Sequence, residues 1–94
     1  MAGSEAPYEL VVAGPAARAL AEAIPKAVAV AVMDLITGPL LADPQRVGKL
    51  LRRELEGIWS ARRGTFRVLY RIEEEQHEVV VLRVEHRRDI YRSR

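Results

Sequence analysis

Between residues 66 and 72 every second side chain is apolar, and two of the three residues between them are arginines. The side chains of one phase are all apolar: Phe66, Val68, Tyr70 and Ile72. The other phase carries Arg67 and Arg71 on either side of Leu69. Successive side chains of a β-strand point to opposite faces of a sheet, so a period of two residues predicts a strand here. One face of this strand is expected to build the core, and the other to be cationic.

A hairpin is predicted around this strand. Residues Leu55–Ile72 have the pattern of two antiparallel strands, joined by a loop at Ser60–Thr65 that contains small residues and Gly64. The expected fold of this region is therefore an antiparallel hairpin that exposes a row of arginines.

A third strand is predicted at His77–Glu85, after a polar turn at residues 73–76. Its segment Val79–Leu82 is apolar in both phases, which is typical of a strand in the interior of a sheet. Arg83 on this strand is expected to lie on the same face of the sheet as Arg67 and Arg71.

The first half of the chain predicts one strand and a helical hairpin. Residues 1–6 are expected to be a flexible lead-in, and residues 7–94 a single domain, which is long enough for one modest core. Strand-like alternation covers Tyr8–Ala13, and apolar stripes at helical spacing cover Ala16–Ile24 and Lys26–Thr37, with Gly38-Pro39 as a stop. The stretch Leu40–Leu55 is expected to be an irregular connector, with a turn or a short helix start at Asp43-Pro44. The fold class is therefore α+β: a strand, a helical hairpin and three antiparallel strands, with the helices packed on one face of the sheet.

Positive charge is concentrated in the middle of the chain. Formal net charge is only +2, but residues 46–71 hold eight basic and two acidic side chains, whereas residues 1–45 hold two basic and five acidic ones. Such a surplus indicates a polyanionic partner, for which a solvated charged surface is the plain alternative. The chain has no cysteine, and its longest apolar run, Ala27–Met33, is far shorter than the roughly 20 residues of a spanning helix. We expect a cytoplasmic protein with no membrane partner.

Most catalytic chemistries find no support in the sequence. Two histidines without cysteines give no credible metal site, no phosphate-binding glycine loop is present, and no cofactor is expected. Arginine stays protonated, but it can hold a phosphate and stabilise charge that develops on it. Metal-free cleavage of RNA needs in-line positioning of the 2′-hydroxyl, a proton acceptor and charge stabilisation. From the residues alone, this reaction is one possibility.

Two motifs resemble a known family. The segment LEGIWSARRGTFRVLYRI, followed by LRVEHRRDIYR, is similar to the RelE/ParE toxin superfamily, and most similar to RelE-type mRNA interferases of bacterial type II toxin–antitoxin systems. The resemblance covers Tyr8–Arg92 and implies a compact α+β fold. It also implies a RelB-like antitoxin that forms a hetero-oligomer with the toxin, and metal-independent cleavage of mRNA in the ribosomal A site by 2′-hydroxyl attack.

The resemblance also implies roles for individual residues. Arg67 matches the strand arginine that holds the scissile phosphate, Arg87 the tail arginine that assists the transition state, and Tyr91 the tyrosine that stacks on a base. His86 matches a tail histidine of a related branch. The expected RNA-binding residues are basic side chains: Lys49, Arg52, Arg53, Arg62, Arg63, Arg71 and Arg83. Ile58 and Ser60 occupy the positions of two family lysines, so the general base is left open.

Two other functions remain open at this point. A ParE-like inhibitor of DNA gyrase, without nuclease activity, would share the fold. A basic nucleic-acid-binding module without toxicity would explain the arginines alone. Primer extension on mRNA after induction would separate the mRNA interferase from the gyrase inhibitor. Normal growth of expressing cells would indicate the binding module without toxicity.

Overall fold

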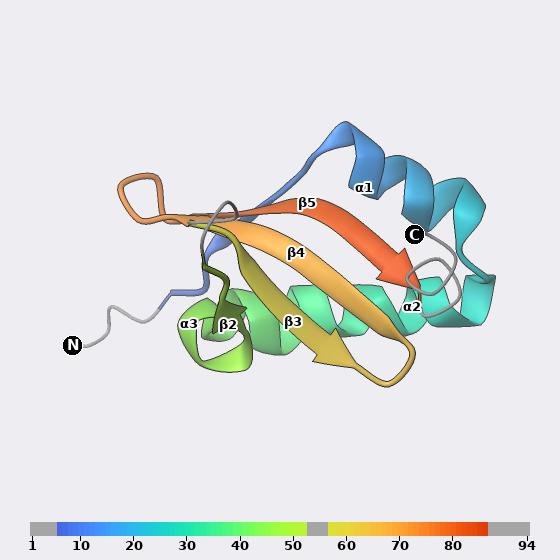
Figure 1. Ribbon diagram of the computed structural model, residues 1–94. Helices are drawn as coiled ribbons and strands as arrows, with labels where there is room; N and C mark the ends of the chain where they lie inside the picture. Colours follow the sequence, from blue (N-terminus) through green and yellow to red (C-terminus); the bar gives the residue numbers. More distant parts are fainter. Residues whose placement is uncertain (1–5, 53–56, 87–94) are drawn as a thin grey trace.

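The computed structural model describes residues 6–52 and 57–86 (Figure 1). The strands are β1 (Glu9–Val12), β2 (Lys49–Leu50), β3 (Trp59–Arg63), β4 (Phe66–Glu73) and β5 (Glu78–His86). The α-helices are α1 (Gly14–Arg18), α2 (Lys26–Leu35) and α3 (Pro44–Val47), and two π-helical segments, η2 (Ala19–Ala23) and η3 (Ile36–Leu40), continue α1 and α2.

The strands form one twisted sheet in the order β1-β5-β4-β3-β2. Strand β1 pairs with β5 in parallel, and every other neighbouring pair is antiparallel. A parallel pair needs a crossover connection, which the helical hairpin provides as it packs on one face of the sheet (Figure 1). The expected α+β architecture is confirmed, and β5 lies inside the sheet between β1 and β4, as predicted.

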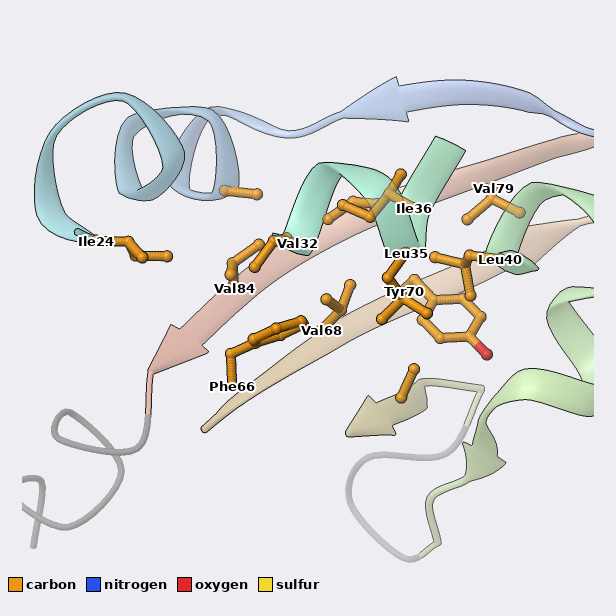
Figure 2. Close-up of a cluster of buried hydrophobic side chains, with 13 residues drawn as sticks. Ile24, Val32, Leu35, Ile36, Leu40, Phe66, Val68, Tyr70, Val79 and Val84 are labelled. Carbon is orange, nitrogen blue, oxygen red and sulfur yellow. The ribbon is translucent and has the colours of Figure 1, made fainter. Parts of the chain in front are cut away.

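The core lies between the helices and this face of the sheet (Figure 2). Side chains of α2 and η3 pack against those of β4 and β5, and the fully buried members include Val32, Leu35, Ile36, Leu40, Val68, Tyr70, Val79 and Val81. Arg67 and Arg71 lie in the opposite phase of β4, as its alternation predicted. We call the sheet face that the helices leave uncovered the open face.

Three boundaries differ from the sequence-based expectation. The hairpin loop is much shorter than Ser60–Thr65, because Arg62 and Arg63 pair with Arg67 and Phe66. Only Gly64 and Thr65 make the turn, and Gly64 has a φ of 60°, which glycine adopts without steric conflict.

The second helix also runs past its predicted stop at Gly38-Pro39. Ile36 and Leu40, four residues apart, are both fully buried, so core packing favours another turn. That turn is of the wider π type, and Pro39, which has no N–H to donate, lies within it.

The stretch Leu40–Leu55, expected to be an irregular connector, contains two regular elements among its described residues. Helix α3 begins at Pro44, where a turn or a short helix start was expected, and Lys49 and Leu50 form a short edge strand opposite Ser60 and Trp59. Two residues are too few to show an alternation, so β2 had no pattern to reveal it.

Candidate functional site

Two rows of side chains cross the open face near the β3–β4 hairpin. Directly paired residues on neighbouring strands point to the same face, so strand register gives the rows. The first row runs across β3, β4 and β5 and contains Arg62, Arg67 and Glu85. The second row runs across β2, β3, β4 and β5 and contains Lys49, Ser60, Leu69 and Arg83.

A hollow of about 410 Å³ opens beside these rows. We call it the basic hollow, and its lining residues come from α3, β2, β3, β4 and the residue after β2: Val47, Lys49, Leu51, Ser60, Arg62 and Arg67. Three of these six side chains are cationic, and none is a carboxylate. Three positive charges around one hollow favour a ligand with phosphate groups.

Arg67 is held on its other side by a carboxylate. Its Nε and Nη2 atoms donate to the same oxygen, Oε1 of Glu85, at 2.9 and 2.6 Å. Both side chains are partly enclosed, with exposed fractions of 29% for Arg67 and 24% for Glu85. Arg67 therefore lies between a fixed carboxylate and the basic hollow.

The wall of the basic hollow is fastened to the sheet by Tyr70. Its hydroxyl donates to the backbone oxygen of Pro44 at 2.6 Å, which ties α3 to β4. Burial raises the pKa of Tyr70 to about 12, against a smaller opposing effect of the Gly48 backbone N–H. Tyr70 is therefore protonated and remains a donor under ordinary conditions.

Gly48 makes this fastening possible. A Cβ at this position would overlap the Tyr70 hydroxyl and would lie 2.9 Å from the backbone oxygen of Ser60. Strand β2 begins at the next residue, Lys49, which pairs with Ser60. The close approach at Gly48 thus sets where Lys49 enters the basic hollow.

The structure brings only some of the predicted site residues together. Lys49, Arg62 and Arg67 line the basic hollow. Arg83 shares the open face, and so does Arg71, whose Nε donates to Glu73 at 3.0 Å.

Other predicted residues lie elsewhere. Arg63 and His86 both pair with Phe66, which places them in the phase of the covered face. Arg63 lines a second hollow of about 380 Å³ between the hairpin turn and α2. Arg52 is exposed just after β2. Arg53, Arg87 and Tyr91 lie outside the described residues.

Sequence reasoning missed Glu85, Tyr70 and Gly48. Glu85 was missed because β5 contains a bulge. Leu69 pairs with Arg83 but Tyr70 pairs with Val81, so Leu82 has no partner in the register. Counting back from the turn without the bulge would place Val84 opposite Arg67. The roles of Tyr70 and Gly48 depend on a contact between distant parts of the chain, for which the sequence has no local signal.

The pattern of residues has counterparts in known proteins. A sequence model of the family described as "ParE toxin of type II toxin-antitoxin system, parDE" matches residues 9–91. The chain is 56% identical over 69 residues to Toxin RelG of Mycobacterium tuberculosis, a match that covers 73% of this chain and 79% of that protein. It is also 42% identical over 86 residues to Toxin RelE of the same organism, covering 92% of this chain and 88% of that protein. The chain belongs to the RelE/ParE toxin family.

The fold agrees with this membership of the RelE/ParE family. The toxin is similar to a chain in the crystal structure of the toxin–antitoxin complex RelBE2 from Mycobacterium tuberculosis, with a TM-score of 0.84 and 49% identity. The match covers 87% of this toxin and 100% of that chain. Within residues 6–52 and 57–86, no helix is long and apolar enough to cross a membrane.

Proposed function

We propose that this toxin is an endoribonuclease that cleaves mRNA in the ribosomal A site without a metal ion. The observation that carries the proposal is the position of Arg67, which lines a hollow shared with two further cations, Lys49 and Arg62. The hollow of about 410 Å³ is within the usual size of a small-molecule site, and it can take a phosphate with an adjoining ribose.

The chemistry uses a nucleophile that the RNA itself carries. The 2′-oxygen attacks the adjacent phosphorus, a 2′-O–P bond forms, and the bond from phosphorus to the 5′-oxygen of the next nucleotide breaks. The products are a 2′,3′-cyclic phosphate and a free 5′-hydroxyl, so one proton leaves the 2′-hydroxyl and one joins the departing oxygen. Arg67, with Lys49 and Arg62, holds the phosphate and stabilises the negative charge that grows on it.

Residues in the C-terminal tail complete the proposed site, with roles taken from the resemblance to the RelE family. Arg87 assists the transition state and Tyr91 stacks on a base of the message. His86 lies in the phase of the covered face at the end of β5, so it would serve only if that end turns toward the substrate. The general base stays unassigned.

We further propose that a RelB-like antitoxin binds this toxin in the cytoplasm as a hetero-oligomer. The similar structure from Mycobacterium tuberculosis is such a complex. An acidic, amphipathic segment would complement Lys49, Arg62 and Arg67, and would keep RNA out of the basic hollow.

The second candidate function is inhibition of DNA gyrase, which the ParE description of the matching family favours. Gyrase inhibition does not require a basic hollow that is lined by Arg67 and can hold a phosphate. Intact mRNA together with lost supercoiling activity after induction would support it.

The test of the nuclease function compares two arginines of one strand. Arg67 and Arg71 both lie on the open face of β4, but only Arg67 lines the basic hollow. On translated mRNA, primer extension should detect breaks with the wild-type toxin. Arg67→Lys should produce the same breaks at a reduced level. Arg67→Ala should lose about 100-fold or more of the activity, because a charge that binds the transition state is gone. Arg71→Ala should cleave like the wild type, and equal cleavage by both alanine variants would remove Arg67 from the site.

A further inference from the structure

Glu85 contacts Arg67 in a way that fixes one edge of its guanidinium. Two donors of Arg67, Nε–H and one Nη2–H, converge on the single oxygen Oε1 of Glu85. A guanidinium has five N–H donors in a rigid plane, so within the part of the chain that the structure describes three of them, on Nη1 and Nη2, remain for another partner. Arg67 also lines the basic hollow, which lies toward β3, whereas Glu85 lies on β5.

The described residues contain a second arginine–glutamate pair that lacks these features. Arg71 donates to Glu73 through Nε alone, at 3.0 Å, and the two residues are neighbours on one strand. Their side chains are 48% and 42% exposed, against 29% and 24% for Arg67 and Glu85. An exposed pair of this kind contributes little fixed geometry, whereas an enclosed, two-donor pair restricts a long side chain to one orientation.

We infer that Glu85 is a positioning residue for Arg67. It holds the guanidinium so that its free N–H donors meet a phosphate in the basic hollow. The inference rests on the proposed nuclease function, and it adds a residue that the family resemblance did not supply. Arginine has many rotamers, and holding one of them in advance lowers the entropy that must be lost in the transition state.

This role separates binding of RNA from its cleavage. Glu85 carries a negative charge beside a basic hollow, so its removal strengthens the attraction of the hollow for RNA. Its removal also frees Arg67 to move, which slows the cleavage step. A side chain that merely stabilised the fold would not weaken one of these properties and strengthen the other.

The test uses the full-length toxin on ribosomes that carry a defined message, with binding and single-turnover cleavage measured separately. Glu85→Ala should cut about 10- to 100-fold more slowly at saturation, the effect of a misplaced catalytic group, with no loss of affinity. Glu85→Gln should stay within about fivefold of the wild type, because its amide oxygen accepts the same hydrogen bonds. Glu73→Ala makes the same charge change at the exposed pair and should cleave at the wild-type rate.

Several results would overturn the inference. They are a wild-type cleavage rate in Glu85→Ala, equally slow cleavage by Glu85→Gln, or a defect confined to affinity. If the wild-type toxin leaves the message intact, the proposed nuclease function fails and the inference fails with it.

A measurement on the wild-type toxin alone tests the contact without any variant. The Nε–H proton of Arg67 should exchange with solvent at least about 10-fold more slowly than that of the exposed Arg62, since a hydrogen bond to a partly enclosed carboxylate protects it. Equal exchange rates would show that Glu85 does not hold Arg67, whatever the toxin does to RNA.

Discussion

Gly48 shows how much of the basic hollow depends on a single missing side chain. The Tyr70 hydroxyl and the Ser60 backbone both approach its Cα so closely that no Cβ fits. Its backbone dihedrals, φ −114° and ψ −173°, are open to any residue, so the requirement for glycine is one of space. Removing that space should push α3 and Lys49 away from the sheet.

We expect Gly48→Ala to lower the free energy of unfolding by about 1–3 kcal/mol, the usual effect of overpacking. Gly38→Ala is the matched control, since a Cβ at Gly38 would meet no atom within 4 Å. Because Gly38 lies in the helical segment η3, this substitution should leave the free energy of unfolding unchanged or raise it by up to about 1 kcal/mol. Urea unfolding of the two variants makes the comparison.

A double variant tests the cause. Tyr70→Phe removes the atom that the new methyl group would overlap, so Gly48→Ala should destabilise the Tyr70→Phe background less than the wild type. Fully additive effects of the two substitutions would show that the hydroxyl is not the obstacle.

At the scale of elements, the bulge at Leu82 decides which side chains of β5 reach each face. Val79 and Val81 are buried, and strict alternation would send Arg83 into the core after them. The extra residue shifts the phase, so Val84 is buried instead and Arg83 is exposed. The same shift brings Glu85 opposite Arg67.

This phase shift predicts unequal effects for one substitution at two valines of β5. Val84→Thr places a hydroxyl among buried apolar side chains and should lower the free energy of unfolding by about 1–3 kcal/mol. Val80→Thr makes the same change opposite Arg71 on the open face and should be nearly neutral. Thermal or urea unfolding that ranks Val80→Thr as the more damaging variant would contradict this register of β5.

The same elements show what the sequence could and could not predict. Strand β4, with its long alternation, and the helical hairpin were predictable because apolar periodicity reports burial directly. Strand β5 was predictable because its run Val79–Leu82 is apolar in both phases. The bulge, the edge strand β2 and the continuation of the helix through Pro39 were not, since each depends on contacts with distant residues. Of the candidate site, Arg67 was predictable from its strand phase and its motif. Its partner Glu85 was not, because one unpaired residue changes the register.

At the scale of the whole molecule, the open face has a basic end and an acidic end. At one end, Arg62 of β3 and Arg67 of β4 are opposite each other in the strand register, and Lys49 lines the same hollow. At the other end, a row of carboxylates crosses β1, β5 and β4, formed by Glu9, Glu78 and Glu73. An approaching polyanion is attracted to one end and repelled from the other, so charge alone orients it.

Association with RNA should therefore weaken with salt in a defined way. Each phosphate contact on a single strand contributes about −0.7 to the slope of log K against log salt, so Lys49→Ala should make the slope shallower by about that amount. Lys26 is an exposed residue at the start of α2, on the side of the sheet that the helices cover, so Lys26→Ala should leave the slope unchanged and serves as the control. Titrations of a short single-stranded RNA between 50 and 200 mM salt suit the measurement, and a flat response in the wild type would point to a protein target instead.

The parallel pairing of β1 with β5 also determines when the toxin can finish folding. Glu9 of β1 pairs with Glu78 of β5, so the first of the described strands can pair only after the last of them has been synthesised. A contact between such distant residues closes slowly and late. The described sheet is therefore completed only after β5 has been synthesised, and a nascent chain that still lacks β5 has neither the carboxylate that holds Arg67 nor the strand that pairs with β1.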